Sequence, residues 1–288
     1  MTTASGVPAV VAVVGGGRMG AGIAQVFAVA GAEVTIAEAD DASAAAAVER
    51  VEQGLHRAAE KGKLDASPAD VLRRLSTVTS LSKIPADAGL VVEAVPERIT
   101  AKLAVLTAVE KVVSQTAVLA SNTSSLSITE MAAALDHPRR FLGMHFFNPV
   151  PASVLVEVVR APETDWPTVK NVLDWVHTLG KSDVVVKDSP GFATSRLGVA
   201  LGLEAIRMLE EGIADAESID RAMELGYRHP MGPLRSTDLV GLDVRLAIAE
   251  HLAATLGARF DPPQLLRDKV SHGDVGRKAG QGFYFWRT

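Results

Sequence analysis

A glycine-rich turn constrains the fold more than any other feature of this sequence. The stretch Val10-Val-Ala-Val-Val-Gly-Gly-Gly-Arg-Met-Gly-Ala-Gly22 starts as a short apolar strand, and residues 18–30 that follow favour a helix. Its glycines have the spacing G-x-G-x-x-G. In a strand–turn–helix unit these glycines permit a tight turn, close approach of a pyrophosphate and close packing of helix on strand. The turn therefore predicts a dinucleotide site, lined by Gly15, Gly16, Gly17, Arg18, Met19 and Gly20.

An acidic residue follows at the distance that a dinucleotide site requires. Glu38 ends the second apolar run, 18 residues after Gly20. A carboxylate there can accept hydrogen bonds from both ribose hydroxyls of the adenosine, and it would repel a 2′-phosphate. The following Ala39-Asp40-Asp41 supplies no compensating Arg or Lys. We expect NAD rather than NADP. The alternative is that Glu38 is simply a solvated strand end.

Short apolar runs alternate with helical segments over the first two thirds of the chain. The helices expected between the early runs cover residues 18–30, 42–60 and 98–113. The apolar runs are nearly continuous rather than alternating, as in strands that are covered on both faces. This alternation predicts an α/β fold with a parallel, doubly wound sheet. The predicted strands are Val10–Val14, Val34–Ala37, Leu90–Val95, Ala117–Ala120, Phe141–His145, Val154–Val159 and Val184–Val186.

The pattern changes after Lys187-Asp-Ser-Pro-Gly-Phe192. From there to about residue 270 the sequence reads as helices interrupted by Gly and Pro, with apolar residues at three- and four-residue spacing. We place a domain boundary near residues 187–191. The prediction is a Rossmann-type domain of residues 1–188, followed by a smaller all-helical domain of residues 189–288.

Composition excludes several classes of protein and of site. The net charge of −5 gives no electrostatic case for nucleic acid or membrane partners. The absence of Cys rules out disulfides, thiolate metal sites and a Cys nucleophile, and the seven His residues show no clustering typical of a metal site. No segment resembles a membrane span or a signal peptide, so we expect a cytoplasmic protein.

Two polar residues stand out in the apolar stretch Gly143–Val159. His145 ends one apolar run, and Glu157 interrupts another, twelve residues later. A buried carboxylate needs a charged or hydrogen-bonding partner. Pro149 and Pro151 turn the chain between the two runs, so the two side chains can meet across a pair of strands. The alternative is a core His beside an edge-strand Glu.

From residue 9 onward the chain resembles the L-3-hydroxyacyl-CoA dehydrogenase family, the bacterial 3-hydroxybutyryl-CoA dehydrogenases in particular. The resemblance extends over almost the whole chain, in order and at the family's spacing. The segments that carry it are Gly15–Ala30, Val91-Val-Glu-Ala-Val-Pro-Glu97, Ala120-Ser-Asn-Thr-Ser-Ser-Leu126, Gly143–Val159, Asp188-Ser-Pro-Gly-Phe192, Met231-Gly-Pro-Leu234, Asp238 to Asp243 and Gly280-Gln-Gly-Phe-Tyr284.

The resemblance implies a reaction and the residues that perform it. The expected activity is the reversible, NAD-dependent oxidation of a short-chain L-3-hydroxyacyl-CoA in fatty acid metabolism, by a homodimer and without a metal. His145 matches the general base, and Glu157 matches the residue that orients it. Ser124 matches the serine that binds the substrate oxygen beside the His; its alternative role is to cap the helix predicted to start at Ile128.

Other positions match contacts of the cofactor or of CoA. Glu97 and Lys102 match residues near the nicotinamide ribose, or else they are a first-turn acid and a solvated lysine of the next helix. Asn148 matches a cofactor contact or forms an Asn-Pro turn. Lys278 matches a cofactor contact or is a solvated tail lysine. Lys61 matches the CoA-binding helical arm, although a lysine near a helix C-terminus is also ordinary dipole chemistry.

The main departure from the family lies at Ser195. The family usually reads P-G-F-x-x-N-R at the start of its helical domain, whereas this chain has Pro190-Gly-Phe-Ala-Thr-Ser-Arg196. Ser195, which we expect near the substrate, replaces an Asn that reaches the active site in the family. Two other functions stay open: a dehydrogenase of a non-CoA hydroxy acid, and a catalytically weak NAD-binding protein.

Overall fold

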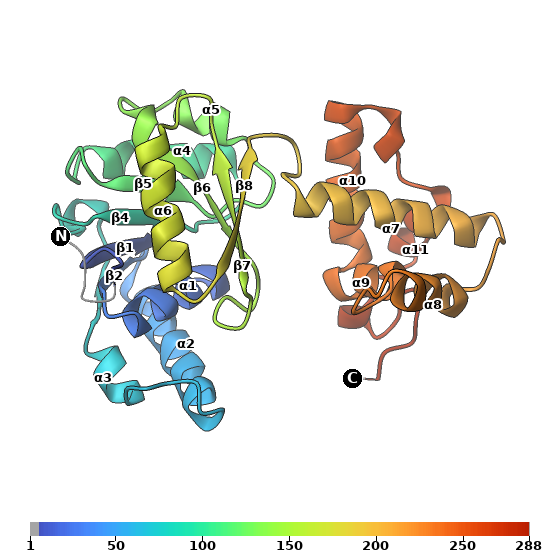
Figure 1. The fold of residues 1–288 in the computed structure, drawn as a ribbon, viewed down its shortest axis with the longest axis horizontal. Helices are drawn as coiled ribbons and strands as arrows, with labels where there is room; N and C mark the ends of the chain where they lie inside the picture. Colours follow the sequence, from blue (N-terminus) through green and yellow to red (C-terminus); the bar gives the residue numbers. More distant parts are fainter. Residues whose placement is uncertain (1–5, 288) are drawn as a thin grey trace. The chain divides into compact units, whose positions relative to one another are not determined.

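The computed structural model describes residues 6–287 and divides into two compact units, Met1–Asp188 and Ser189–Thr288 (Figure 1). The first unit contains a sheet flanked by helices, and the second consists of helices. The predicted fold class is therefore confirmed. Within residues 6–287, no helix has the length and apolar character needed to cross a membrane.

The first unit is built on an eight-stranded sheet of order β3-β2-β1-β4-β5-β6-β7-β8. Every neighbouring pair is parallel except β6 and β7, which are antiparallel. The order of the strands reverses between β1 and β4, where ligands bind in folds of this type. The strands are β1 (Val10–Val14), β2 (Glu33–Ala37), β3 (Leu75–Val78), β4 (Leu90–Glu93), β5 (Val118–Ser121), β6 (Phe141–Phe146), β7 (Leu155–Arg160) and β8 (Ser182–Lys187).

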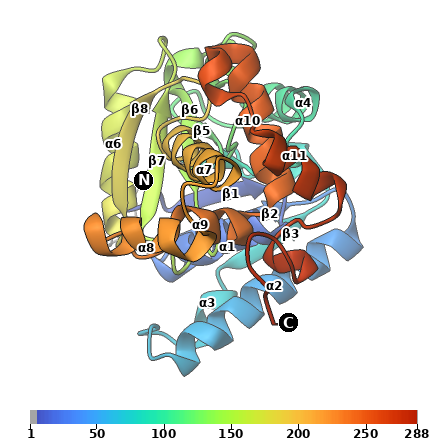
Figure 2. The same cartoon turned by 90° about the vertical axis from the view of Figure 1, so that its right-hand side faces the viewer.

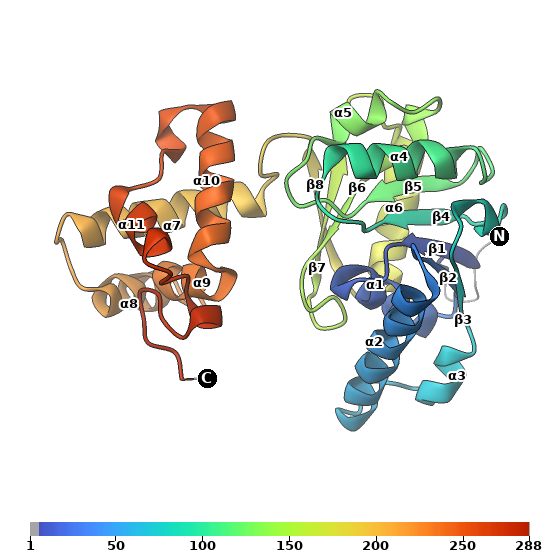
Figure 3. The ribbon, with the colours of Figure 1, turned by 180° about the vertical axis from the view of Figure 1, so that it is seen from behind.

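Helices cover both faces of this sheet. Figure 1 shows α6 in front of the sheet, and Figure 3, from behind, shows α4 over its other face. One large apolar core joins α1, α2 and α6 to one face of the strands. The α-helices of this unit are α1 (Arg18–Val29), α2 (Asp41–Glu60), α3 (Pro68–Leu72), α4 (Ile99–Glu110), α5 (Ile128–Ala132) and α6 (Trp166–Thr178).

The pleat of the strands assigns neighbouring residues to opposite faces. Met144 and Val158 belong to the core under α1 and α6. His145 and Glu157, one residue along each strand, therefore point to the opposite face. Helix α5 covers that face, because a Cβ added at Gly143 would lie 2.9 Å from a side-chain carbon of Ile128. The polar pair thus lies on the face of the sheet that α5 covers.

Two details of the sheet differ from the prediction. Strand β3 was not predicted, because its residues Leu75–Val78 mix polar and apolar types and form no apolar run. The expectation that all strands are covered on both faces is wrong for β8, where Val184 and Val185 are 40% and 37% exposed. Both strands lie at the edges of the sheet, where cover is incomplete.

The second unit is a small helical domain. Figure 2 shows α7 nearly end-on, with α9 below it and α10 and α11 beside it. Apolar side chains from these helices, such as Leu203, Leu234 and Leu252, form its core. Its α-helices are α7 (Thr194–Glu210), α8 (Ala216–Gly226), α9 (Pro233–Val240), α10 (Leu242–Leu256) and α11 (Gln264–Ser271).

A buried carboxylate fixes the C-terminal tail of this unit. Asp238 in α9 is 1% exposed and accepts hydrogen bonds from the backbone N–H groups of Phe283 and Tyr284, at 2.9 Å each. Its second oxygen also accepts from Nε1 of Trp286 at 2.8 Å. The segment that carries the Gly-Gln-Gly-Phe-Tyr motif is therefore tied to the helical core.

Candidate active site

The glycine turn after β1 has the geometry that its spacing predicts. Gly15 has φ +94°, and a Cβ there would lie 2.8 Å from the carbonyl oxygen of Ala94. A Cβ at Gly20 would lie 1.7 Å from the carbonyl oxygen of Gly15, so α1 packs too closely on the turn for any side chain. A Cβ at Gly17, in contrast, would meet nothing within 4 Å. The backbone at the start of α1 is therefore open to a phosphate group, as a dinucleotide site requires.

Glu38 lies against this turn. Its Oε1 accepts a hydrogen bond from the backbone N–H of Gly16 at 2.5 Å, and its Oε2 accepts from that of Ala39 at 3.3 Å. It is half-buried, so the alternative of a merely solvated strand end does not describe it. Arg50, which sequence reasoning missed, donates to the carbonyl oxygen of Gly16 at 3.2 Å. Arg50 lies 34 positions further along the chain, so no local pattern pointed to it.

A pocket of about 370 Å³ opens beside the glycine turn, at the carboxyl ends of the strands. It is formed by the start of α1 and by the residues that follow β4, β5 and β6. This is the crevice in which doubly wound sheets bind their ligands. The lining residues are Met19, Ala94, Val95, Glu97, Asn122, Ser124, His145, Phe146, Phe147 and Asn148.

His145 and Glu157 meet directly, as the sequence predicts. They are register partners across β6 and β7, and Nδ1 of His145 lies 2.8 Å from Oε2 of Glu157. The Glu157 side chain is fully buried, and β7 lies between β6 and β8, so Glu157 is not an edge-strand residue. The ring of Phe147 packs against the imidazole with 4.4 Å between the ring centroids. The imidazole thus lines the pocket, whereas the Glu157 carboxylate that orients it does not.

Ser124 belongs to a turn that surrounds the Glu97 carboxylate. Oε1 of Glu97 accepts from the backbone N–H of Ser124 at 3.0 Å and from the hydroxyl of Thr123 at 2.5 Å. Both Glu97 and Ser124 line the pocket. The alternative role of Ser124 as a helix cap is wrong, because Ser127 caps α5 by accepting from the N–H of Glu130. Thr123, to which the sequence analysis gave no role, belongs to the same Ser-Asn-Thr-Ser-Ser motif.

Hydrogen bonds and a neighbouring positive charge favour the ionised form of Glu97. Burial raises the pKa of Glu97, but the Thr123 hydrogen bond and the charge of Lys102 outweigh it, and the pKa lies below its usual value. Glu97 precedes α4 and is not in its first turn, so the first-turn alternative is wrong. The solvated-lysine alternative is also wrong, because the Lys102 side chain is 1% exposed. Lys102 pairs with Glu97 at 3.2 Å and with Glu93 at 2.8 Å.

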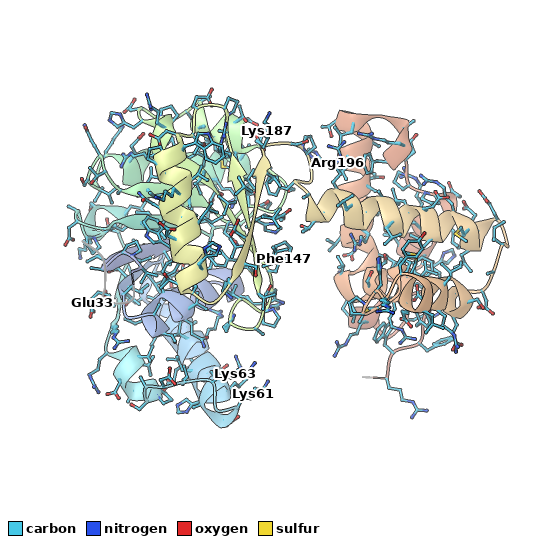
Figure 4. All side chains as sticks on the ribbon, in the orientation of Figure 1. Glu33, Lys61, Lys63, Phe147, Lys187 and Arg196 are labelled. Carbon is cyan, nitrogen blue, oxygen red and sulfur yellow. The ribbon has the colours of Figure 1, made fainter. Side chains whose placement is uncertain are left out.

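Asn148 and Lys61 occupy different parts of the first unit. Asn148 lines the pocket, is exposed, and precedes Pro149 through a cis peptide bond. Lys61 directly follows the last turn of α2 and is not among the residues that line the pocket. Figure 4 shows Lys61 and Lys63 at the end of α2 that lies away from Phe147.

The remaining expected site residues belong to the second unit. Nζ of Lys278 lies 2.6 Å from Oδ2 of Asp243, and the side chains are about half exposed. Burial raises the pKa of Asp243, but the Lys278 hydrogen bond helps to hold it below its usual value. Lys278 is therefore ion-paired rather than simply solvated. Ser195 lies half-buried in the first turn of α7.

Comparisons with known proteins agree with this geometry. The NAD-binding domain of 3-hydroxyacyl-CoA dehydrogenase matches residues 10–189, and the C-terminal domain of the same family matches residues 191–286. A probable 3-hydroxybutyryl-CoA dehydrogenase of Bacillus subtilis is 42% identical over 94% of this chain and 95% of its own length. A 3-hydroxybutyryl-CoA dehydrogenase of Mycobacterium tuberculosis is 43% identical over 95% of this chain and 97% of its own.

A solved structure shares the fold over nearly the full length. The (S)-3-hydroxybutyryl-CoA dehydrogenase of Ralstonia eutropha superposes with a TM-score of 0.92 at 40% identity, covering 98% of this chain and 100% of that one. Similarity of this extent over both units goes beyond a shared fold. The chain belongs to the 3-hydroxyacyl-CoA dehydrogenase family.

Proposed function

We propose that the protein catalyses the reversible, NAD-dependent oxidation of an L-3-hydroxyacyl-CoA to a 3-oxoacyl-CoA. The observation that carries the proposal is the His145–Glu157 pair, which presents an imidazole to a pocket beside a dinucleotide turn. The relatives named above are 3-hydroxybutyryl-CoA dehydrogenases. Their names favour a short acyl chain for this protein as well.

The residues of the first unit fit NAD as the cofactor. The open backbone at Gly17 suits the pyrophosphate, and the Glu38 carboxylate beside Gly16 suits the adenosine ribose. Because a carboxylate repels a 2′-phosphate, we propose that NAD is preferred over NADP. Arg18 and Met19 follow the turn, and Glu97 and Asn148 line the pocket where the nicotinamide end would lie. Bound NAD supplies the hydride acceptor.

His145 is the proposed general base. We assign Nδ1 as the donor to the buried Glu157 carboxylate, which fixes the ring, and we propose that Nε2 takes the hydroxyl proton. The negative charge of Glu157 favours the imidazolium that results. Ser124, in the same pocket, is proposed to hold the reacting oxygen with its hydroxyl group. In the reductive direction His145 returns the proton to the 3-oxo oxygen.

The contacts to CoA and the roles of the second unit are also proposals. Lys61 is exposed at the end of α2, where an ammonium group is available to a phosphate of CoA. We propose that Ser195 contacts the substrate and that Lys278 contacts the cofactor. Lys278 would then exchange or share its contact with Asp243 when the cofactor binds.

We further propose a homodimer that acts in fatty acid metabolism in the cytoplasm. The second unit carries exposed apolar side chains on α7, α9 and α10, including Leu197 at 70% and Val240 at 45%. Such side chains are commonly buried in an interface between subunits. Sedimentation analysis should give twice the 30.2 kDa mass of the chain.

The test of the proposed reaction is a kinetic panel. NADH consumption should be measured with 3-oxoacyl-CoAs of several chain lengths, and repeated with NADPH. We expect the highest kcat/KM with acetoacetyl-CoA and NADH. Activity on polyol acids and none on any acyl-CoA would establish instead a dehydrogenase of non-CoA hydroxy acids. NADH binding without turnover of either class would establish a weak NAD-binding protein.

A further inference from the structure

One buried acid near the pocket has no role in the proposed chemistry. Glu93 ends β4 and is fully buried. Its Oε1 accepts from Nζ of Lys102 at 2.8 Å and from the N–H of Val95 at 2.7 Å. Its Oε2 accepts from Nζ of Lys102 at 3.0 Å and from the hydroxyl of Ser121 at 2.5 Å. Each oxygen therefore has two donors.

Lys102 is engaged just as fully. Besides Glu93, its ammonium group donates to the carbonyl oxygen of Val95 at 3.2 Å and pairs with Oε2 of Glu97 at 3.2 Å. Its side chain is 1% exposed, so the ammonium has almost no contact with solvent. The ammonium group is therefore fixed between the carboxylates of Glu93 and Glu97.

The two oxygens of Glu97 face different partners. Oε2 is paired with Lys102, while Oε1 collects the donors of the turn that carries Ser124. The chain of contacts thus runs from Glu93 through Lys102 and Glu97 to Ser124. Glu93 and Lys102 come from consecutive elements, β4 and α4, so they hold Glu97 between two fixed points of the fold.

We propose that Glu93 and Lys102 form a positioning pair that holds the Glu97 carboxylate ionised and oriented, and with it the Ser124 turn, for the nicotinamide end of the site. The inference rests on the proposed roles of Glu97 and Ser124. Glu93 has no contact with the pocket and acts only through Lys102.

The pair has to be removed as a unit to test this. Glu93→Gln alone would turn an amide donor toward groups that are themselves donors, and Lys102→Met alone would leave Glu93 buried without its counter-charge. Either change costs stability for reasons unrelated to Glu97. Replacing both residues, as Glu93→Gln with Lys102→Met, removes both charges, and replacing a whole buried ion pair is often tolerated.

The same helix supplies a matched control. Glu110, at the other end of α4, pairs with Arg140 at 3.5 Å, and both side chains are buried, at 5% and 8% exposed. Arg140 directly precedes β6, at the opposite end of that strand from His145. Glu110→Gln with Arg140→Met therefore removes a comparable buried pair away from the pocket.

The experiment measures the dissociation constant of NADH against pH, together with kcat/KM for acetoacetyl-CoA and the thermal midpoint. Without Lys102, the pKa of Glu97 rises, because the charge of Lys102 is one cause that holds it low. The loss of NADH affinity on acidification should then begin at a higher pH. At neutral pH we expect NADH affinity to be roughly tenfold weaker, by analogy with the loss of a residue that orients a metal ligand.

The outcomes separate the inference from the proposed site. If Glu97→Gln leaves NADH affinity and turnover unchanged, the assignment of Glu97 to the site is wrong. If Glu97→Gln weakens binding but the Glu93/Lys102 double variant does not, only the positioning role is overturned. A loss of NADH affinity that is equal at every pH would show that the pair does not act through the ionisation of Glu97, which also overturns the inference.

A control variant separates a loss of protein stability from a change in the pH dependence of NADH affinity. The control double variant should lower the thermal midpoint but leave the pH dependence of NADH affinity as in the parent. If the Glu93/Lys102 double variant fails to fold, Ser121→Ala removes only the 2.5 Å donor to Glu93. It should shift the same acidic limb in the same direction by a smaller amount, and an unshifted limb would contradict the inference.

Discussion

Two histidines of the first unit make nearly the same contact in different surroundings. Nδ1 of His145 lies 2.8 Å from Glu157, and Nε2 of His177 lies 2.6 Å from Asp183. The first pair is buried, with side chains 9% and 0% exposed, whereas the second is 59% and 21% exposed. The hydrogen bond alone therefore does not distinguish a base from a surface ion pair.

The position of each pair in the fold makes the difference. His145 lies near the carboxyl end of β6, where the pocket meets the glycine turn. His177 lies in the last turn of α6 and is not among the residues that line the pocket. Burial strengthens the effect of Glu157 on its His, while solvent screens that of Asp183. The first pair can do chemistry that the second cannot.

The largest expected effect separates the two histidines. His145→Gln should lower kcat by roughly 10²–10⁴-fold, the usual contribution of a general base, while NADH still binds. His177→Gln should leave kcat within about twofold and alter stability by less than about 1 kcal/mol, as for an exposed ion pair. Steady-state kinetics and NADH titration measure both. If the His145→Gln enzyme keeps the kcat of the parent, His145 is a core residue and not the general base.

Substitution of the two acids, Glu157 and Asp183, should also affect turnover unequally, but by a smaller factor than substitution of the two histidines. Glu157→Gln should slow turnover roughly 10- to 100-fold, because the base remains but loses its charged acceptor. It should also cost about 1–3 kcal/mol of unfolding free energy through a poorly paired buried group. Asp183→Asn should change neither by a measurable amount. Equal effects of the two substitutions would mean that burial does not set the pairs apart.

The preference for NADH over NADPH tests whether the glycine turn beside the His145 pocket binds the cofactor as proposed. Glu38→Ala should reduce the preference for NADH over NADPH, because the carboxylate that repels the 2′-phosphate is gone. The ratio of the two kcat/KM values measures the effect, with Asp40→Ala as a control, since Asp40 caps α2 instead. If the parent already uses both cofactors equally, Glu38 does not select the cofactor.

The smallest effect is expected at Ser195. A water molecule can bridge the gap left by the shorter side chain, so Ser195→Asn should keep or modestly raise kcat/KM for acetoacetyl-CoA. If Ser195 instead makes room for a bulkier acyl group, the substitution should impair that substrate while it helps the short one. Uniform loss across the acyl-CoA panel, with folding and NADH binding intact, would give Ser195 a role of its own.

Much of the fold and of the central pair could be predicted because the signals are local. The glycine spacing defined the turn, and apolar runs defined seven of the eight strands. The two prolines between the runs indicated that His145 and Glu157 could meet, and they are register partners. Strand β3 could not be predicted, since an edge strand needs no continuous apolar run.

The interactions that the sequence did not predict depend on distant or ambiguous residues. Lys102 has the composition of a surface lysine in an ordinary helix, and only the packing of α4 against β4 buries it beside Glu93. Arg50 reaches the glycine turn from another helix. Three serines in the motif Ser121–Ser125 are alike in sequence, yet Ser121 binds Glu93 and Ser124 binds Glu97. Side-chain identity alone does not assign such partners.

The pH dependence of kcat/KM for oxidation tests the central claim most directly, because it follows the base itself. Protonation of the base should reduce the rate on the acidic side of the profile. We predict that this acidic limb is present in the parent and in His177→Gln, and is absent from the residual activity of His145→Gln. An acidic limb that persists unchanged in His145→Gln would contradict the account, since another group would then be accepting the proton.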